Sequence, residues 1–474
     1  MASLADKFSR IAALKPARSI SRPATLRAPD REDFLCQLLG AAIATNRYGE
    51  HVCVRNWFSS PALTEPAQVT LRLLARSRDD TLSKRMQVAL SDPEKWLFLD
   101  TETTGLSGGT GTYAFLVGLA WWDAGGLQVE QLFLRDFAEE HSILQEVAGR
   151  LAERPVLVTF NGKTFDWPLL ENRFTMTRAI PVPRLAAHLD LMHPARALWR
   201  LRLGSVRLVD LERHVLDPVR LGWHRDDDVA SSVIPRQYFD FLRGGPVEPL
   251  VAILRHNQMD LRGLAALFGK IDARLAAQSG DSELDGLDLF GLSRFLQRKG
   301  DADRAHSACE QALNLGLPAE FRGQARHELA LLAKRRGHHT QAASLWEGLI
   351  ADERRGMLAC EQLAIHYERR LKNFGRALEF AQLALAKLRR AQHDRRNPSD
   401  GAGNPRLEER FLNRIARLQH LMNSSSSLLP TLGGSQTLPL DMRNGQKTRR
   451  GSLPATLNSK EEIGWKHQPQ NRNL

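Results

Sequence analysis

Apolar and polar positions alternate in a β/α pattern between residues 96 and 276. Short apolar runs are typical of buried strands, and they occur over 96–99, 113–122, 127–134, 155–160 and 185–191. Apolar positions three or four apart predict helices over 139–153, 165–174 and 250–275. Only the turn at 123–126 separates the second run from the third, which predicts a hairpin meander. The pattern therefore predicts an α/β fold, with a mixed five-stranded sheet flanked by helices.

The segments before residue 96 follow a weaker pattern. Residues 31–95 contain a short apolar helical pattern over 34–42 and a turn into a strand over 48–54. We interpret them as a small helix and strand region. Residues 1–30 are basic and rich in Ser and Ala, which predicts a disordered arm.

The region 285–390 shows helical spacing throughout, and it repeats. Its glycines recur at spacings of 37 and 38 residues, at Gly300, Gly337 and Gly375. An alanine follows each of them, at Ala305, Ala342 and Ala377. A glycine at the turn and a small residue where helices cross are typical of stacked helix pairs. The pattern resembles degenerate tetratricopeptide repeats, which predicts a surface for a protein partner. Residues 391–474 are rich in Ser, Asn and Arg and predict a mostly disordered basic tail, with a short helix over 407–422.

Composition narrows the classes of protein. The chain has 474 residues, of which 42% are hydrophobic, so it is too apolar to be wholly disordered. Its four cysteines form no CxxC pair, which argues against a zinc ribbon or a dithiol redox site and favours reduced thiols in a cytoplasmic protein. No apolar run approaches about 18 residues, so we expect no membrane-spanning helix.

The net charge of +12 is concentrated at the two ends of the chain. Residues 1–30 hold six Lys or Arg and two Asp, and residues 389–474 hold fifteen Lys or Arg and seven Asp or Glu. The body between them is neutral, with 45 residues of each sign. Basic ends on a neutral body suit a nucleic-acid partner, because phosphate contacts release counterions. Simple solubilisation is the alternative.

Three groups of acidic residues supply candidate chemistry. Asp100 and Glu102 end an apolar strand and lie on the same face, where a divalent cation would relieve their repulsion. Asp166 begins a helix after another buried strand, and His256 and Asp260 share one helix face. Each group has a plainer alternative: a salt-bridged strand end, an acid favoured by the helix dipole, or a structural histidine.

Two other segments are less specific. The run Asp226–Asp228 is best interpreted as a solvated loop. The glycine-rich insert 107–111 lacks the ending of a phosphate-binding loop, so it is either a flap beside the site or a simple hairpin connection.

Together these motifs resemble those of the DEDD superfamily of 3′–5′ exonucleases, which have the ribonuclease-H-like fold. The resemblance is to its YprB-like branch, and it rests on four segments of the chain: 100–118, 161–168, 234–235 and 256–257. It covers roughly residues 40–390, and it places the nuclease domain at 96–276 and the helical repeats at 285–390. His256 precedes Asp260 by four residues, which is the spacing of members with Tyr at this position.

The resemblance implies a metal-dependent nuclease, a 3′–5′ exonuclease on single-stranded or frayed nucleic acid. It implies two divalent cations, Mg²⁺ or Mn²⁺, held by four carboxylates: Asp100, Glu102, Asp166 and Asp260. In this interpretation His256 takes the proton of the attacking water. Candidate substrate-binding residues are Thr103, Gly105 and Asn161. The alternative is a non-catalytic nucleic-acid-binding or scaffold protein that acts through its helical repeats.

Overall fold

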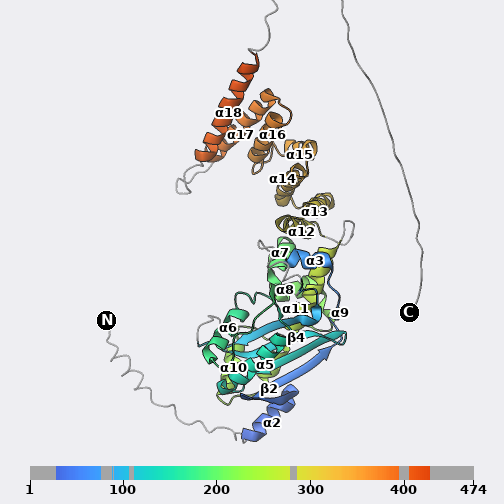
Figure 1. The fold of residues 1–474 in the computed structure, drawn as a ribbon, viewed down its shortest axis with the longest axis vertical. Coiled ribbons are helices and arrows are strands. Elements are labelled where there is room, and N and C mark those ends of the chain that lie inside the picture. Colours follow the sequence, from blue (N-terminus) through green and yellow to red (C-terminus); the bar gives the residue numbers. More distant parts are fainter. Residues whose placement is uncertain are drawn as a thin grey trace, which may run out of the picture. The chain divides into compact units, whose positions relative to one another are not determined.

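The computed structural model describes residues 28–75, 88, 90–105, 111–277, 285–393 and 405–426. Its helices and strands are labelled in Figure 1. The insert at 107–111, apart from Gly111, lies outside the described residues, and so do residues 1–27, 394–404 and 427–474.

One mixed sheet of seven strands forms the centre of the α/β part. Its order across the sheet is β1 (Ala41–Asn46), β2 (Gly49–Phe58), β5 (Gly126–Phe133), β4 (Ala114–Asp123), β3 (Trp96–Thr103), β6 (Val156–Thr159) and β7 (Ala187–Asp190). Strands β3, β6 and β7 are parallel to one another, and every other neighbouring pair is antiparallel.

The five predicted strands are all present, but the prediction of a five-stranded sheet is wrong by two. Strands β1 and β2 come from the region 31–95, and β2 pairs with β5, with Val52 opposite Phe133. Val52 is completely buried, so this segment belongs to the core of the sheet. The sequence separates it from the other strands by about forty residues, which is why no local pattern joined them.

Helices cover both faces of the sheet (Figure 1). Trp96 and Phe98 of β3 pack with α7 (Met192–Leu203) and α11 (Pro249–Ala276) on one face. Leu97 and Leu99 pack on the other face with α5 (Glu140–Glu153), α6 (Asp166–Thr177) and α10 (Ile234–Leu242). The shorter elements are α2 (Ala28–Leu39), α3 (Gln68–Ala75), η1 (Pro93–Lys95), η2 (Phe137–Glu139), α8 (Leu208–Leu211), the π-helical turn η3 (Glu212–Leu216) and α9 (Pro218–Leu221).

The rest of the described chain is helical, and its first six helices form three pairs that are consecutive along the chain. The helices are α12 (Gly286–Lys299), α13 (Ala302–Leu315), α14 (Ala319–Arg335), α15 (His339–Glu347), α16 (Gly356–Arg369), α17 (Phe374–His393) and α18 (Pro405–Ser426). The predicted alanines are fully buried, at Ala305, Ala342 and Ala377. Whether the pairs are tetratricopeptide repeats stays a prediction.

Two of the three predicted turn glycines lie at turns. Gly300 and Gly337 have φ values of 76° and 84°, a backbone that glycine adopts without strain. Gly375 instead lies inside α17, and Lys372, with a φ of 54°, makes the third turn. The first predicted spacing of 37 residues is therefore present, but the second turn-to-turn spacing is 35 residues and not 38.

Both ends that the sequence predicts to be disordered contain helical segments, including the helix predicted over 407–422. Residues 28–30, placed in the basic arm, begin α2. In the tail 391–474, α18 is a helix of 22 residues that buries Phe411 and Leu418 against the other helices. Arg414 and Arg417 of α18 also pair with the buried Glu368 of α16. Within the described residues no helix is long and apolar enough to cross a membrane, and all four cysteines are free thiols.

Candidate active site

Asp100 and Glu102 lie where β3 reaches the carboxyl end of the parallel strands. Asp100 is opposite Gly118 of β4, and Asn257 of α11 fills the space that Gly118 leaves. The Asn257 amide donates to Asp100 Oδ2 at 2.8 Å and accepts from Gln131 Nε2 at 2.8 Å. Asn257 is fully buried, so it holds Asp100 in one orientation.

Asp166 approaches from the turn that follows β6. Thr101, the residue between the two β3 acids, donates to Asp166 Oδ1 at 2.6 Å. The turn itself is held by Asp190, which accepts from the backbone nitrogens of Asn161 at 2.8 Å and Lys163 at 3.3 Å. Asn161 has a φ of 67°, so its role in the structure is to shape this turn.

His256 and Asp260 of α11 complete the group. His256 Nε2 lies 3.8 Å from Glu102 Oε1 and 3.6 Å from Asp260 Oδ2. The other ring nitrogen, Nδ1, lies 2.8 and 2.9 Å from the two oxygens of Asp228. The interpretation of Asp226–Asp228 as a solvated loop is therefore wrong for Asp228, although Asp226 and Asp227 are exposed.

Arg225 links three carboxylates of the site and has only 9% of its side chain exposed. Its guanidinium binds Glu212 at 2.5 and 2.7 Å and Asp228 at 2.8 Å, and it also pairs with Asp260. Gly263 of α11 leaves room for Glu212, because a Cβ there would lie 2.1 Å from Glu212 Oε1.

The sequence interpretation assigned no role to Arg225, Glu212 or Asn257. Asn257 lies in one of the segments that carry the family resemblance, but its contacts with Asp100 and Gln131 are evident only in the structure. Glu212 and Arg225 belong to a segment without periodicity, so only the three-dimensional contacts reveal them.

Burial and mutual repulsion make these carboxylates hard to ionise. Burial, followed by the charges of Asp260, Asp166 and Glu102, raises the pKa of Asp100 well above its usual range. Burial raises the pKa of Glu102 to about 8 and that of Asp166 to about 6. For His256, burial lowers the pKa, but Asp260, Glu102 and Asp228 outweigh it and raise the pKa overall.

The described residues around the site include fewer cationic side chains than carboxylates. Six carboxylates belong to it: Asp100, Glu102, Asp166, Glu212, Asp228 and Asp260. Among the described residues, the cationic side chains within ion-pair distance of these six are Arg225 and His256. The same part of the chain contains no group of three His, Cys, Asp or Glu side chains already arranged around a metal position. Asp100, Asp166 and Asp260 are instead bonded to Asn257, Thr101 and Arg225.

A pocket of about 480 Å³ opens beside the acids. Glu102 and Asp166 line it together with Thr103 and Gly105, two of the predicted substrate-binding residues. Asn161, the third, does not line it. Phe165 also lines the pocket, and 57% of this residue is exposed.

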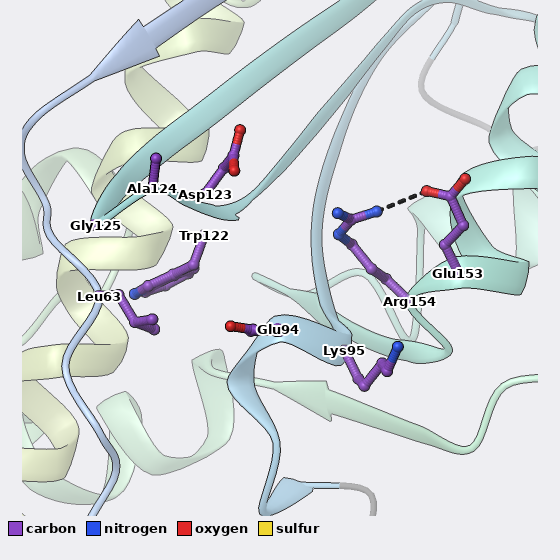
Figure 2. Close-up of a pocket in the computed structure, with 9 residues that line it drawn as sticks. All are labelled: Leu63, Glu94, Lys95, Trp122, Asp123, Ala124, Gly125, Glu153 and Arg154. Carbon is purple, nitrogen blue, oxygen red and sulfur yellow. Dashed lines mark hydrogen bonds and ion pairs between the residues drawn. The ribbon is translucent and has the colours of Figure 1, made fainter.

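A second pocket, of about 490 Å³, lies at the opposite ends of the strands (Figure 2). Lys95 precedes β3, and Trp122 lies near the end of the antiparallel β4. Glu153 and Arg154, which form an ion pair at 2.7 Å, precede β6. None of the predicted site residues lines this pocket, so the structure separates it from the acids.

Three comparisons relate the chain to known proteins. Residues 97–271 match the RNase_H superfamily. The uncharacterized protein YprB of Bacillus subtilis (strain 168) is 30% identical over 293 residues, which are 61% of this chain and 68% of YprB. The family B DNA polymerase of the hyperthermophilic archaeon Pyrobaculum calidifontis is 15% identical with a TM-score of 0.29. The match covers 43% of this chain and 29% of the polymerase, a likeness too weak to inform on function.

Proposed function

This chain belongs to the YprB family of the RNase H superfamily, and we propose that it is a metal-dependent nuclease acting on nucleic acid. One observation carries the proposal: carboxylates from β3, α6 and α11 gather at one edge of the sheet with too few cations to balance them. Such a cluster is unstable in isolation, and hard divalent cations relieve it. The polarity we propose is 3′–5′, on single-stranded or frayed ends.

The donor set fits Mg²⁺ or Mn²⁺. Asp100, Glu102, Asp166 and Asp260 offer oxygen ligands, which these ions prefer over the nitrogen and sulfur ligands that suit zinc. Two such ions, when bound, neutralise charge on the phosphate and make a bound water more acidic. Asp260 is paired with Arg225, so we propose that its carboxylate turns from Arg225 when it serves as a ligand.

The remaining residues of the site would accept the proton of the attacking water and hold the accepting histidine in place. His256 Nε2 faces Glu102 and Asp260, where it can accept the proton of the attacking water. Asp228 binds the opposite ring nitrogen and so orients the imidazole. Arg225 in turn holds Asp228 in place.

The pocket beside the acids suits the end of a nucleic-acid strand. Phe165 exposes an aromatic ring on which a base can stack without regard to sequence. Thr103 and Gly105 line the same pocket and can contact the sugar and phosphate. Asn161 contributes by shaping the turn that presents Phe165 and Asp166.

The test is digestion of single- and double-stranded DNA and RNA, labelled at either the 3′ or the 5′ end, with Mn²⁺ or EDTA. The proposal predicts stepwise loss of nucleotides from the 3′ end in Mn²⁺ and none in EDTA. Asp100→Ala, purified identically, should abolish the cleavage. Its metal-free melting temperature should change little, because relief of the repulsion around Asp100 offsets the loss of the bond from Asn257.

Wild-type-like cleavage by Asp100→Ala would place the activity elsewhere or in a contaminant. Internal cuts in place of terminal ones would support nuclease activity and refute the proposed 3′–5′ exonuclease activity. Binding without any cleavage, on all four substrates, would favour the non-catalytic nucleic-acid-binding protein.

A further inference from the structure

Two neighbouring turns of the helical region carry a run of cationic side chains. The turn between α14 and α15 and the turn between α16 and α17 each join the two helices of a pair. We call their basic residues the basic turn surface, which consists of Lys334, Arg335, Arg336, His338, His339, Arg369, Arg370 and Lys372.

The two turns lie close enough to act on each other. Lys334 at the end of α14 donates to Gln362 of α16 at 2.8 Å. Burial lowers the pKa of Lys334, and the charges of Arg369 and Arg370 lower it further. Burial likewise lowers the pKa of His366, with His339 as the next cause. The two turns therefore share one positive field.

Acidic side chains leave most of this field uncompensated. No Asp or Glu occurs between Glu328 and Glu347. Glu368 lies beside the second turn, but it is buried and pairs with Arg414 and Arg417. Three other acids near the two turns also have partners: Glu347 accepts from Tyr367, Glu361 pairs with Arg410, and Asp303 pairs with Arg336.

Most of the surface has no ion-pair partner. Within the described parts of the chain, Arg336 pairs with Asp303 at 2.9 Å, whereas Arg335, Arg369 and Arg370 are exposed and form no ion pair. Three exposed guanidiniums without carboxylates repel one another, and an anionic ligand relieves this repulsion.

We propose that the basic turn surface binds the phosphate backbone of single-stranded nucleic acid. The choice of nucleic acid over an acidic protein rests on the proposed function, which already assigns a nucleic-acid substrate to this chain. It also fits the chemistry, because one guanidinium group can donate two hydrogen bonds to a phosphate, and such contacts do not depend on the identity of the base. The helical region thereby gains a role in holding substrate, beyond the protein partner that its repeat pattern predicts.

The test compares two triple variants of the full-length protein. Arg335→Gln, Arg369→Gln and Arg370→Gln remove three charges from the surface. The matched control removes three from exposed arginines elsewhere in the helical region that form no ion pair with any described residue: Arg326, Arg354 and Arg390. Binding of a fluorescein-labelled oligonucleotide of about 20 nucleotides is followed by anisotropy in EDTA, so cleavage plays no part.

The surface variant should bind roughly tenfold more weakly at about 0.1 M salt. The slope of log affinity against log salt concentration should become shallower by about 2, because each of the three lost phosphate contacts contributes about 0.7 for a single strand. The control should stay within about twofold of the wild type. Equal losses in the two variants would overturn the proposal, because total charge would then explain them. Displacement of the oligonucleotide by polyglutamate at equal charge concentration would identify an acidic protein as the ligand and overturn it as well.

The outcomes separate this surface from the active site. Loss of binding in the surface variant, with no cleavage by any form of the protein in Mn²⁺, would refute the proposed nuclease activity and support the proposed binding surface. Unchanged binding with normal 3′ cleavage would do the reverse.

Discussion

Gly118 allows α11 to approach the sheet at the candidate site, and replacing it with Ala should distort that site. An added Cβ would lie 2.2 Å from Asn257 Oδ1, 2.7 Å from Nδ2 and 2.8 Å from Cγ. All three distances are far below van der Waals contact. Asn257 is fully buried and cannot move into solvent. The amide must therefore leave its bonds with Asp100 and Gln131, or α11 must move away from β4.

The cost follows from the contacts that are lost. The bond from Asn257 to the Asp100 carboxyl is worth about 1–3 kcal/mol, and the bond from Gln131 about 1 kcal/mol. Overpacking of a tight interior adds about 1–3 kcal/mol, and these terms overlap because one movement relieves several of them. We expect a loss of about 3–5 kcal/mol. For a domain of 150–250 residues, that lowers the melting temperature by roughly 6–20 °C.

Differential scanning calorimetry of metal-free protein measures this loss, and a second glycine provides the control. Gly269 lies in the same helix α11 with open space around its Cβ position, so Gly269→Ala should raise stability by up to about 1 kcal/mol. Asn257→Ala removes the group that the new Cβ would meet. In that background Gly118→Ala should cost less than about 1 kcal/mol, a large coupling between the two positions.

A Gly118→Ala protein as stable as the wild type would refute this reasoning. So would an equal cost of Gly118→Ala with and without Asn257, since the clash would then be with some other group.

Two further predictions address the site and the core. Asp228→Asn should lower kcat of cleavage roughly 10–100-fold with KM unchanged, because His256 loses the carboxylate that orients it. The control is Asp227→Asn, a change at an exposed neighbour, which should leave kcat unaltered. Equal effects of the two changes would contradict the role of Asp228. Glu130 is 1% exposed and binds Arg55 and Arg150; burial raises its pKa, but the two arginines outweigh burial and lower it overall. Its stabilisation is thus present above the unfolded pKa of about 4.3 and is lost as pH falls through the lower folded value. Glu130→Gln should cost about 1–3 kcal/mol at pH 7, and the difference in melting temperature should shrink as pH falls from about 5 to 3; a difference that stays constant would mean that the charge of Glu130 is irrelevant.

Strands and helices with strong local patterns could be predicted from the sequence, and those that depend on distant partners could not. Strands β3 and β4 are continuous apolar runs, and they lie within one residue or so of their predicted starts. Strand β1 reads Ala-Ala-Ile-Ala-Thr-Asn, which has no strand signal of its own and was partly assigned to a helix. Its pairing with β2, itself paired with β5, decides its conformation. Helix α18 combines the two cases: the sequence predicts a short helix over 407–422, but the burial of Phe411 and Leu418 against the other helices is evident only in the structure.

For the candidate site, the residues carried on regular elements were predictable, and the residues that hold them were not. Asp100, Glu102, Asp166 and Asp260 follow strand ends and helix positions, which the hydrophobic pattern locates. Asp228 comes from a segment of short turns with no period. Its neighbours Asp226 and Asp227 are exposed, so nothing in the run of three acids distinguishes the one that binds His256.

The two proposed binding surfaces share one cause: the fold gathers acidic side chains in one place and basic side chains in another. Residues 31–388 carry 45 charges of each sign, so their composition suggests no electrostatic partner. In the fold, six carboxylates meet at one edge of the sheet, while uncompensated arginines meet at two turns of the helical region. These are the two requirements of a nuclease that uses metal ions: acids to hold cations at the scissile phosphate, and cations to hold the remaining phosphates. The neutral region 31–388 meets both requirements only by segregating its charges. The prediction that the basic ends supply the phosphate contacts therefore needs the addition of a basic surface within the folded chain.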